Sequence, residues 1–181
     1  EIKQLENALD AYRLESYKGR ISKAEYLKKA LAFLNIKDND KFFNEFADVF
    51  RKNFSNIKVK ENISKVFEKL KSEGIKIAIL TDTFVTEQKK WEWFKGINID
   101  QFIDIIICSS VTGHTKDEKE AYEITLQKLN LKPEEVVFVG HKKYEMRGTK
   151  LAGIKSFSIE KNVGEDYYIE LQRHGIKEQD Q

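Results

Sequence analysis

The 181-residue sequence contains one cysteine, one proline, one methionine and no long apolar run. The single cysteine, Cys108, excludes an internal disulfide and is typical of a reducing compartment, so we expect a cytoplasmic location. No apolar stretch reaches the roughly 18 residues that a membrane-spanning helix needs. The polar start, from Glu1 to Gln4, has neither a signal peptide nor an initiator Met, and we expect the chain to begin inside a longer protein.

An excess of charge of either sign is also absent. The chain has 32 basic and 30 acidic residues, and a net charge of +2 gives no electrostatic reason to expect nucleic acid or a membrane surface as a partner. The motifs G-x-S-x-G, G-x-G-x-x-G and G-x-x-x-x-G-K-[ST] are missing. The three histidines, His114, His141 and His174, lack the spacing of a zinc site. The pattern of apolar segments is therefore the main evidence.

That pattern changes near residue 57. Before it, apolar residues recur at helical spacing, and Ser22 to Glu25 forms a capping box that predicts the start of a helix. After it, helical stripes alternate with short apolar runs that predict strands at 75–80, 103–108, 136–139, 154–158 and 167–169. Such alternation is typical of right-handed βαβ units. We therefore predict an all-helical part (1–57) followed by an α/β part (58–181) with a mainly parallel sheet and flanking helices.

Polar groups follow three of the predicted segments. The first strand ends on Thr81 and Asp82, a polar loop leads to Lys116, and Glu145 lies in the loop after Gly140. Ligands of open α/β sheets bind at the carboxyl ends of the strands, so we interpret these places as parts of one phosphate-handling site. The hydroxyl of Thr81 can donate to a phosphoryl oxygen, and the ammonium group of Lys116 can neutralise the phosphoryl charge. The carboxylate of Glu145 can bind a hard cation.

Taken singly, each of these residues also has a plain structural interpretation. Thr81 could cap a loop, Lys116 could be a solvated lysine, and the segment around Glu145 could be a surface turn. Their order along the chain is the more specific signal.

That order resembles the haloacid dehalogenase-like (HAD) hydrolase superfamily over about residues 58–169. The stretches that carry the resemblance are 116–129, 132–140 and 148–154. It implies a Rossmann-like sheet, with residues 1–57 as the helical cap that this family inserts after its first strand. It also implies Mg²⁺-dependent hydrolysis of a small phosphorylated metabolite through an aspartyl-phosphate.

The resemblance assigns roles to individual residues. Thr81 and Lys116 are expected to be catalytic, and Thr81, Asp82 and Lys116 to bind the phosphoryl group. Glu145 is expected at the Mg²⁺ site. Two aromatic residues of the cap, Phe43 and Phe46, are expected to contact the substrate.

Two features depart from the family pattern. The opening strand with its D-x-D nucleophile is absent, since Asp38-Asn39-Asp40 lies in a polar turn between predicted helices. The acid expected directly after Gly140 is replaced by His141, and an imidazole cannot replace a carboxylate as a Mg²⁺ ligand without loss of affinity.

Three explanations fit these departures. The first strand, which normally lies between the predicted strands 75–80 and 136–139, can precede this chain in a longer enzyme. It can come from another chain, or the protein can be a non-catalytic binding relative of the family. A sheet without its middle strand would leave two strand edges unpaired, which favours the first explanation, whereas His141 favours the last. We expect a phosphatase whose nucleophile lies upstream, with the non-catalytic protein as the alternative.

Overall fold

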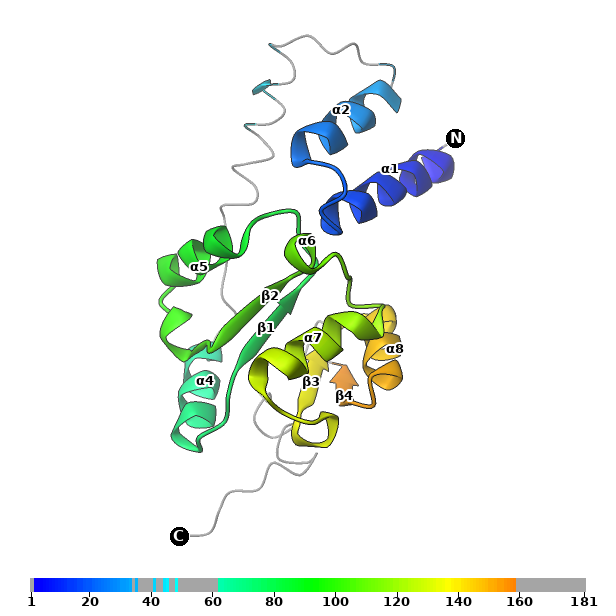
Figure 1. Ribbon diagram of the computed structural model, residues 1–181. Helices are drawn as coiled ribbons and strands as arrows, with labels where there is room; N and C mark the ends of the chain where they lie inside the picture. The colour runs from blue at the N-terminus through cyan, green and yellow to red at the C-terminus, as the bar shows by residue number, and fades with distance from the viewer. Residues whose placement is uncertain are drawn as a thin grey trace.

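The computed structural model describes residues 2–33, 35, 41, 44, 45, 48 and 62–158. The predicted strand 167–169, Phe43 and Phe46 lie outside these residues, as does the boundary near residue 57, and stay predictions. The helices and strands, labelled as in Figure 1, are α1 (Ile2–Tyr17), α2 (Lys23–Phe33), α4 (Ile63–Ser72), β1 (Ala78–Thr81), α5 (Glu87–Gly96), η1 (Asp100–Phe102), β2 (Ile105–Cys108), α6 (Ser109–Thr112), α7 (Lys119–Leu129), η2 (Pro133–Glu135), β3 (Val137–Gly140), α8 (Lys143–Leu151) and β4 (Lys155–Ser158).

Helices α1 and α2 pack against each other at one end of the molecule, in the part expected to be the cap, and are called the cap below (Figure 1). The predicted capping box is confirmed. The Ser22 N–H donates to Glu25 Oε2 at 2.9 Å, and the Glu25 N–H donates to Ser22 Oγ at 3.1 Å, so two donors at the start of α2 are satisfied. Leu27 and Leu31 are buried, which gives α2 its apolar face.

The strands form two parallel pairs, which confirms the predicted parallel α/β architecture. In β1 and β2, Thr81 lies opposite Cys108, and β3 and β4 pair in the same parallel sense. Strand β1 begins at Ala78, three residues later than predicted. The reason is Asp104, whose Oδ2 accepts the Ile77 N–H at 2.6 Å, so a side chain takes the place of a ladder hydrogen bond there.

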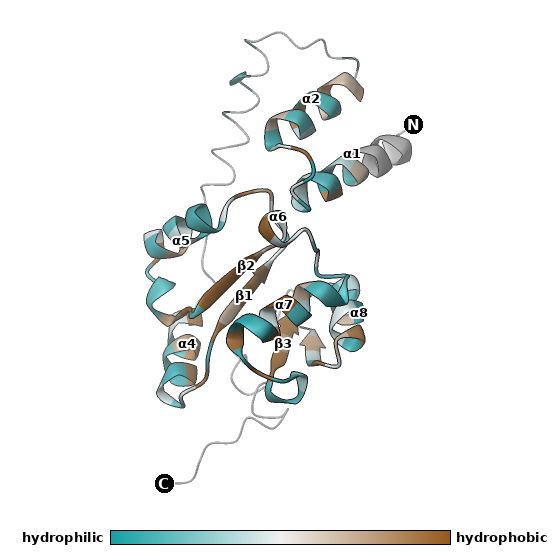
Figure 2. Cartoon of the chain, in the orientation of Figure 1, coloured by the Kyte–Doolittle hydropathy of each residue, from teal (hydrophilic) through white to brown (hydrophobic). Residues whose placement is uncertain are grey.

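Helices α4 and α7 cover opposite faces of both strand pairs. One hydrophobic cluster joins α4 to Ile77 and Val137, and another joins α7 to Leu80 and Phe138. Because successive side chains of a strand point to opposite faces, neighbouring residues of β3 reach different helices. Figure 2 shows the apolar strands between helices whose outer faces are hydrophilic. The two strand pairs therefore share the same two covering helices.

Strands β1 and β3 each keep an edge without a strand neighbour among the described residues. Each is hydrogen-bonded to one strand, β2 or β4 respectively. All of β1 is half-buried, as are Val137, Phe138 and Val139, whereas Ile106 and Ile107 of β2 are buried. Apolar parallel strands are normally covered on both faces and paired on both edges. Among the described residues, β1 and β3 are thus less covered than β2.

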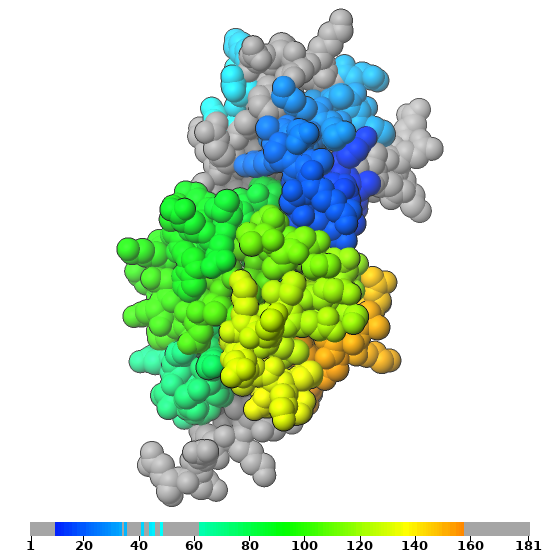
Figure 3. Space-filling view, in the orientation of Figure 1, coloured from blue at the N-terminus to red at the C-terminus, as the bar shows by residue number. Residues whose placement is uncertain are grey.

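The cap rests on the α/β part through the end of α1 (Figure 3). The ring of Tyr17 stacks on Phe84 with centroids 5.8 Å apart. Gly19 has a φ of +69°, and a Cβ at this position would lie 2.4 Å from Ser110 O, so the backbones approach too closely for any side chain. Of the helices that the structure describes, none combines the length and the apolar character that crossing a membrane requires.

Candidate active site

Asp82 joins the loops that follow β1, β2 and β3. It comes directly after Thr81, the half-buried last residue of β1. Its Oδ1 accepts the Lys116 N–H at 3.0 Å, and its Oδ2 accepts the hydroxyl of Tyr144 at 3.2 Å. Burial raises the pKa of Asp82, and the neighbouring Lys116 opposes this shift. The carboxyl ends of β1 and β3 therefore meet at one rim of the sheet.

Lys116 and Glu145 form the buried ion pair of this rim. Lys116 Nζ lies 2.5 Å from Glu145 Oε1, and the two side chains are 14% and 1% exposed. Glu145 Oε2 accepts the N–H groups of His141 at 2.9 Å and of Lys142 at 3.1 Å, at the start of α8. Burial raises the pKa of Glu145, but Lys116 and the two N–H groups outweigh it and the pKa is lowered overall. Glu145 is thus ionised at neutral pH and orients the ammonium group.

Tyr122 and Gly148 fix the backbone around this pair. The hydroxyl of Tyr122 lies 2.8 Å from Lys116 O and 3.0 Å from Glu145 O, and its single proton is shared between these two carbonyls. Burial, followed by the charges of Glu145 and Asp82, raises the pKa of Tyr122, so the hydroxyl keeps its proton. Gly148 lets α8 approach, since a Cβ there would lie 2.2 Å from Lys116 O.

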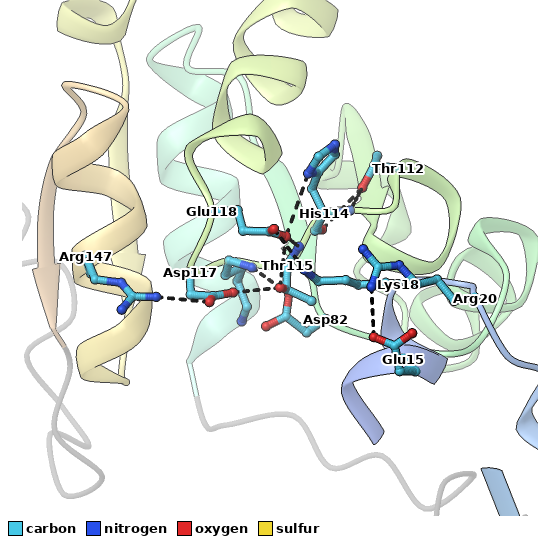
Figure 4. A network of polar contacts seen from close by, with 11 residues as sticks. Glu15, Lys18, Arg20, Asp82, Thr112, His114, Thr115, Asp117, Glu118 and Arg147 are labelled. Atoms are coloured by element: carbon cyan, nitrogen blue, oxygen red, sulfur yellow. Dashed lines mark hydrogen bonds and ion pairs between the residues drawn. The ribbon is translucent and has the colours of Figure 1, made fainter. Parts of the chain in front are cut away.

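Lys116 extends from a closed turn over residues 115–118. The Glu118 N–H donates to Thr115 O at 2.9 Å, and the Thr115 N–H donates to Glu118 Oε2 at 2.9 Å. Asp117 accepts the Thr115 hydroxyl at 2.6 Å and Arg147 of α8 at 3.1 Å (Figure 4). The turn is therefore tied to itself and to the helix that carries Glu145.

The structure brings three of the predicted site residues into contact. Asp82, Lys116 and Glu145 share one hydrogen-bonded cluster beside Thr81, although their functional roles stay predictions. Tyr122 and Tyr144 are part of the cluster and were not expected there. In the sequence, Tyr122 belongs to the apolar stripe of a predicted helix. A tyrosine buried there needs a hydrogen-bond partner for its hydroxyl, and this was the one signal that could have predicted a polar contact.

Mg²⁺ does not fit the described residues by themselves. No three His, Cys, Asp or Glu side chains of the described part gather as a metal site. Glu145 already accepts three donors, and Mg²⁺ requires near-octahedral oxygen coordination. The imidazole of His141 is 51% exposed, with Nδ1 3.8 Å from Glu145 Oε2, and supplies no oxygen. A magnesium site would need carboxylates beyond those described.

Comparison with known proteins connects this geometry to a family. The family model for haloacid dehalogenase-like hydrolases matches residues 5–159. Pyrophosphatase PpaX of Bacillus mycoides is 28% identical over 110 residues, which cover 61% of this chain and 50% of the relative. The chain thus spans about half the length of the curated relatives that it matches.

Solved structures share the fold. A HAD family enzyme of Bacteroides thetaiotaomicron, crystallised as a magnesium complex, has a TM-score of 0.66 at 16% identity, covering 91% of this chain and 80% of that one. The L-2-haloacid dehalogenase of Xanthobacter autotrophicus, with chloropropionic acid covalently bound, has a TM-score of 0.65 at 18% identity, covering 96% and 70%.

Proposed function

The chain belongs to the haloacid dehalogenase-like hydrolase family, and we propose that it forms the cap and most of the core of a phosphatase for a small phosphorylated metabolite. The observation that carries this proposal is the convergence of Lys116, Glu145 and Asp82 beside Thr81 at the carboxyl ends of β1 and β3. The name of the PpaX relatives makes inorganic pyrophosphate one substrate to test.

Lys116 supplies the positive charge that phosphoryl transfer needs. Its ammonium group is mostly buried and held by Glu145, so little reorganisation is required when negative charge develops on the phosphoryl oxygens. In this proposal the hydroxyl of Thr81, the last residue of β1, donates to one of these oxygens. In the proposed reaction a carboxylate attacks phosphorus, the bond to the leaving oxygen breaks, and water then cleaves the aspartyl-phosphate.

The attacking carboxylate needs a further strand. Among the described residues, one edge each of β1 and β3 has no strand neighbour, and with the half-buried side chains this supports a strand between them, in the order β2-β1-strand-β3-β4. Its carboxyl end would then lie between Thr81 and Gly140, next to Lys116. We propose that a preceding segment supplies this strand, and the same edges would accept one from another chain. Any Mg²⁺ in the completed enzyme would need ligands from this strand as well.

Restoring the upstream sequence tests the proposal. The extended protein is expected to hydrolyse p-nitrophenyl phosphate or pyrophosphate in the presence of Mg²⁺. Lys116→Met should lower kcat by roughly 10²-fold or more, as loss of a group that stabilises transition-state charge does. The matched control is Lys119→Met, since Lys119 is exposed and pairs with Glu123 on the surface of α7. No turnover by a folded protein that carries the D-x-D strand would refute the proposal.

His141 favours a second candidate, a non-catalytic protein that binds a phosphorylated ligand. Its imidazole stands where the family has an acid, and Glu145 is committed to Lys116 and to the start of α8. This candidate predicts that orthophosphate binds, that Lys116→Met weakens the binding, and that no phosphate ester is hydrolysed. Release of chloride from 2-chloropropionate would instead indicate a dehalogenase.

A further inference from the structure

The cap holds the turn that presents Lys116. Glu118 closes this turn with Oε2, and its other oxygen, Oε1, accepts Lys18 Nζ from the end of α1 at 2.8 Å. The side chains of Lys18 and Glu118 are 12% and 29% exposed, so the ion pair is screened from water more than a surface pair is. Figure 4 shows Lys18 and Glu118 meeting between the cap and the turn, with Asp82 close by.

We propose that Glu118 is a positioning residue that couples docking of the cap to the placement of Lys116. When Lys18 is in place, one carboxylate is bound to the cap and to the Thr115 N–H at the same time. This inference deepens the proposed function and rests on it, because Lys116 acts on substrate only in the completed enzyme.

The geometry explains why cap movement would reach the turn. The ring of Tyr17 stacks on Phe84, and the backbone of Gly19 contacts Ser110. These two contacts hold the backbone of Lys18, which lies between them, against the α/β part. If the cap moves away, the half-buried carboxylate of Glu118 loses its cation and turns toward other partners. Two such partners already lie beside Glu118 Oε2, the Thr115 hydroxyl at 3.3 Å and His114 Nδ1 at 3.7 Å. The Thr115 N–H then loses its acceptor and the turn loosens.

Burial raises the pKa of Glu118, but hydrogen bonds from Lys18 and from the Thr115 N–H outweigh it, and the pKa is lowered overall. The carboxylate is therefore charged whenever the cap docks near neutral pH. The ion pair between Lys18 of the cap and Glu118 of the turn joins residues that are 100 positions apart in the chain.

Hydrogen exchange on the full chain distinguishes this coupling from an ion pair that only holds the cap and does not affect the 115–118 turn. Lys18→Met removes the charge and keeps the aliphatic stem. Exchange of the Thr115 and Glu118 amides is expected to become about fivefold faster, the upper end of what a solvent-exposed ion pair contributes. The control is Arg20→Met, because Arg20 pairs with Glu15 at 2.9 Å within the cap, and it should leave these amides unchanged.

Kinetics of the enzyme with its nucleophile strand give the second measurement. Lys18→Met and Glu118→Gln should each lower kcat about fivefold with little change in KM, and the double variant should be no slower than Glu118→Gln alone. Unchanged exchange in Lys18→Met, or losses in kcat that multiply, would overturn the coupling. A protein whose exchange responds to Lys18→Met but which shows no turnover in its wild-type form would support the coupling and count against the proposed phosphatase.

Discussion

The contact between α8 and Lys116 makes the substitution Gly148→Ala a sensitive test of the site. The added Cβ would lie 2.2 Å from Lys116 O and 2.6 Å from Tyr122 Cε2, where real Cβ atoms essentially never approach within 3.0 Å. Helix α8 or the backbone of Lys116 must therefore move by at least 0.8 Å, the difference between 3.0 and 2.2 Å. The displaced atom is a backbone carbonyl of the Lys116 turn, which cannot rotate away as a side chain could.

The cost can be weighed against the gain in helix propensity. Overpacking of this kind costs typically about 1–3 kcal/mol. Replacing a glycine inside a helix by alanine stabilises the helix by about 1 kcal/mol. We expect the clash to exceed the gain, because a backbone carbonyl must shift, and the free energy of unfolding to fall by about 1–2 kcal/mol. For a chain of this size the midpoint of thermal unfolding should drop by roughly 2–8 °C.

Thermal unfolding followed by circular dichroism measures this change. Gly96→Ala is the matched control, because Gly96 ends α5 with nothing within 4 Å of its added Cβ. It should raise stability by about 0.5–1 kcal/mol, the usual gain of replacing a helical glycine. A Gly148→Ala protein as stable as the wild type would show that α8 does not press on Lys116, and the reasoning about how this helix holds the site would be refuted.

Three further predictions concern the buried polar groups. Lys116→Met should lower the free energy of unfolding by about 3–5 kcal/mol, since it leaves Glu145 charged, 1% exposed and without its cation, while Lys119→Met should change nothing in the same urea titration. The pKa of Glu145 is lowered from its ordinary value of 4.5, so its contribution to stability is complete above that pH and disappears as the pH falls through the lower folded value. Urea unfolding between pH 7 and pH 3 should therefore show a smaller loss of stability in Glu145→Gln than in the wild type. Thr149→Val should cost about 1–2 kcal/mol in urea unfolding, because it removes a hydrogen bond to Ser156 from a fully buried side chain, and Thr149→Ser should retain most of that stability.

The sequence predicted the architecture because the signals for it are local. The capping box at Ser22, the apolar runs and the alternation of helix and strand each depend on residues close together in the chain. The placement of Lys116 and Glu145 at one rim could also be predicted, because the carboxyl ends of parallel strands lie at the same edge.

The contacts inside the site depend on distant residues and could not be predicted. Tyr144 donates to Asp82 across 62 positions, and Tyr122 meets Glu145 across 23. No pattern indicates that a carboxylate expected to bind phosphate or metal already has protein donors. The late start of β1 also depends on a distant residue, because the side chain of Asp104, just before β2, accepts the Ile77 N–H.

The close approach of Gly19 to Ser110 limits how this family member can be re-engineered. A cap transplanted from a relative would need a residue without a Cβ and with a left-handed backbone at the same junction. With any other residue, the added Cβ would push the transplanted helices away from Ser110, and Lys18 would no longer reach Glu118. Chimeras that keep Gly19 together with Tyr17 and Lys18 should dock as this cap does.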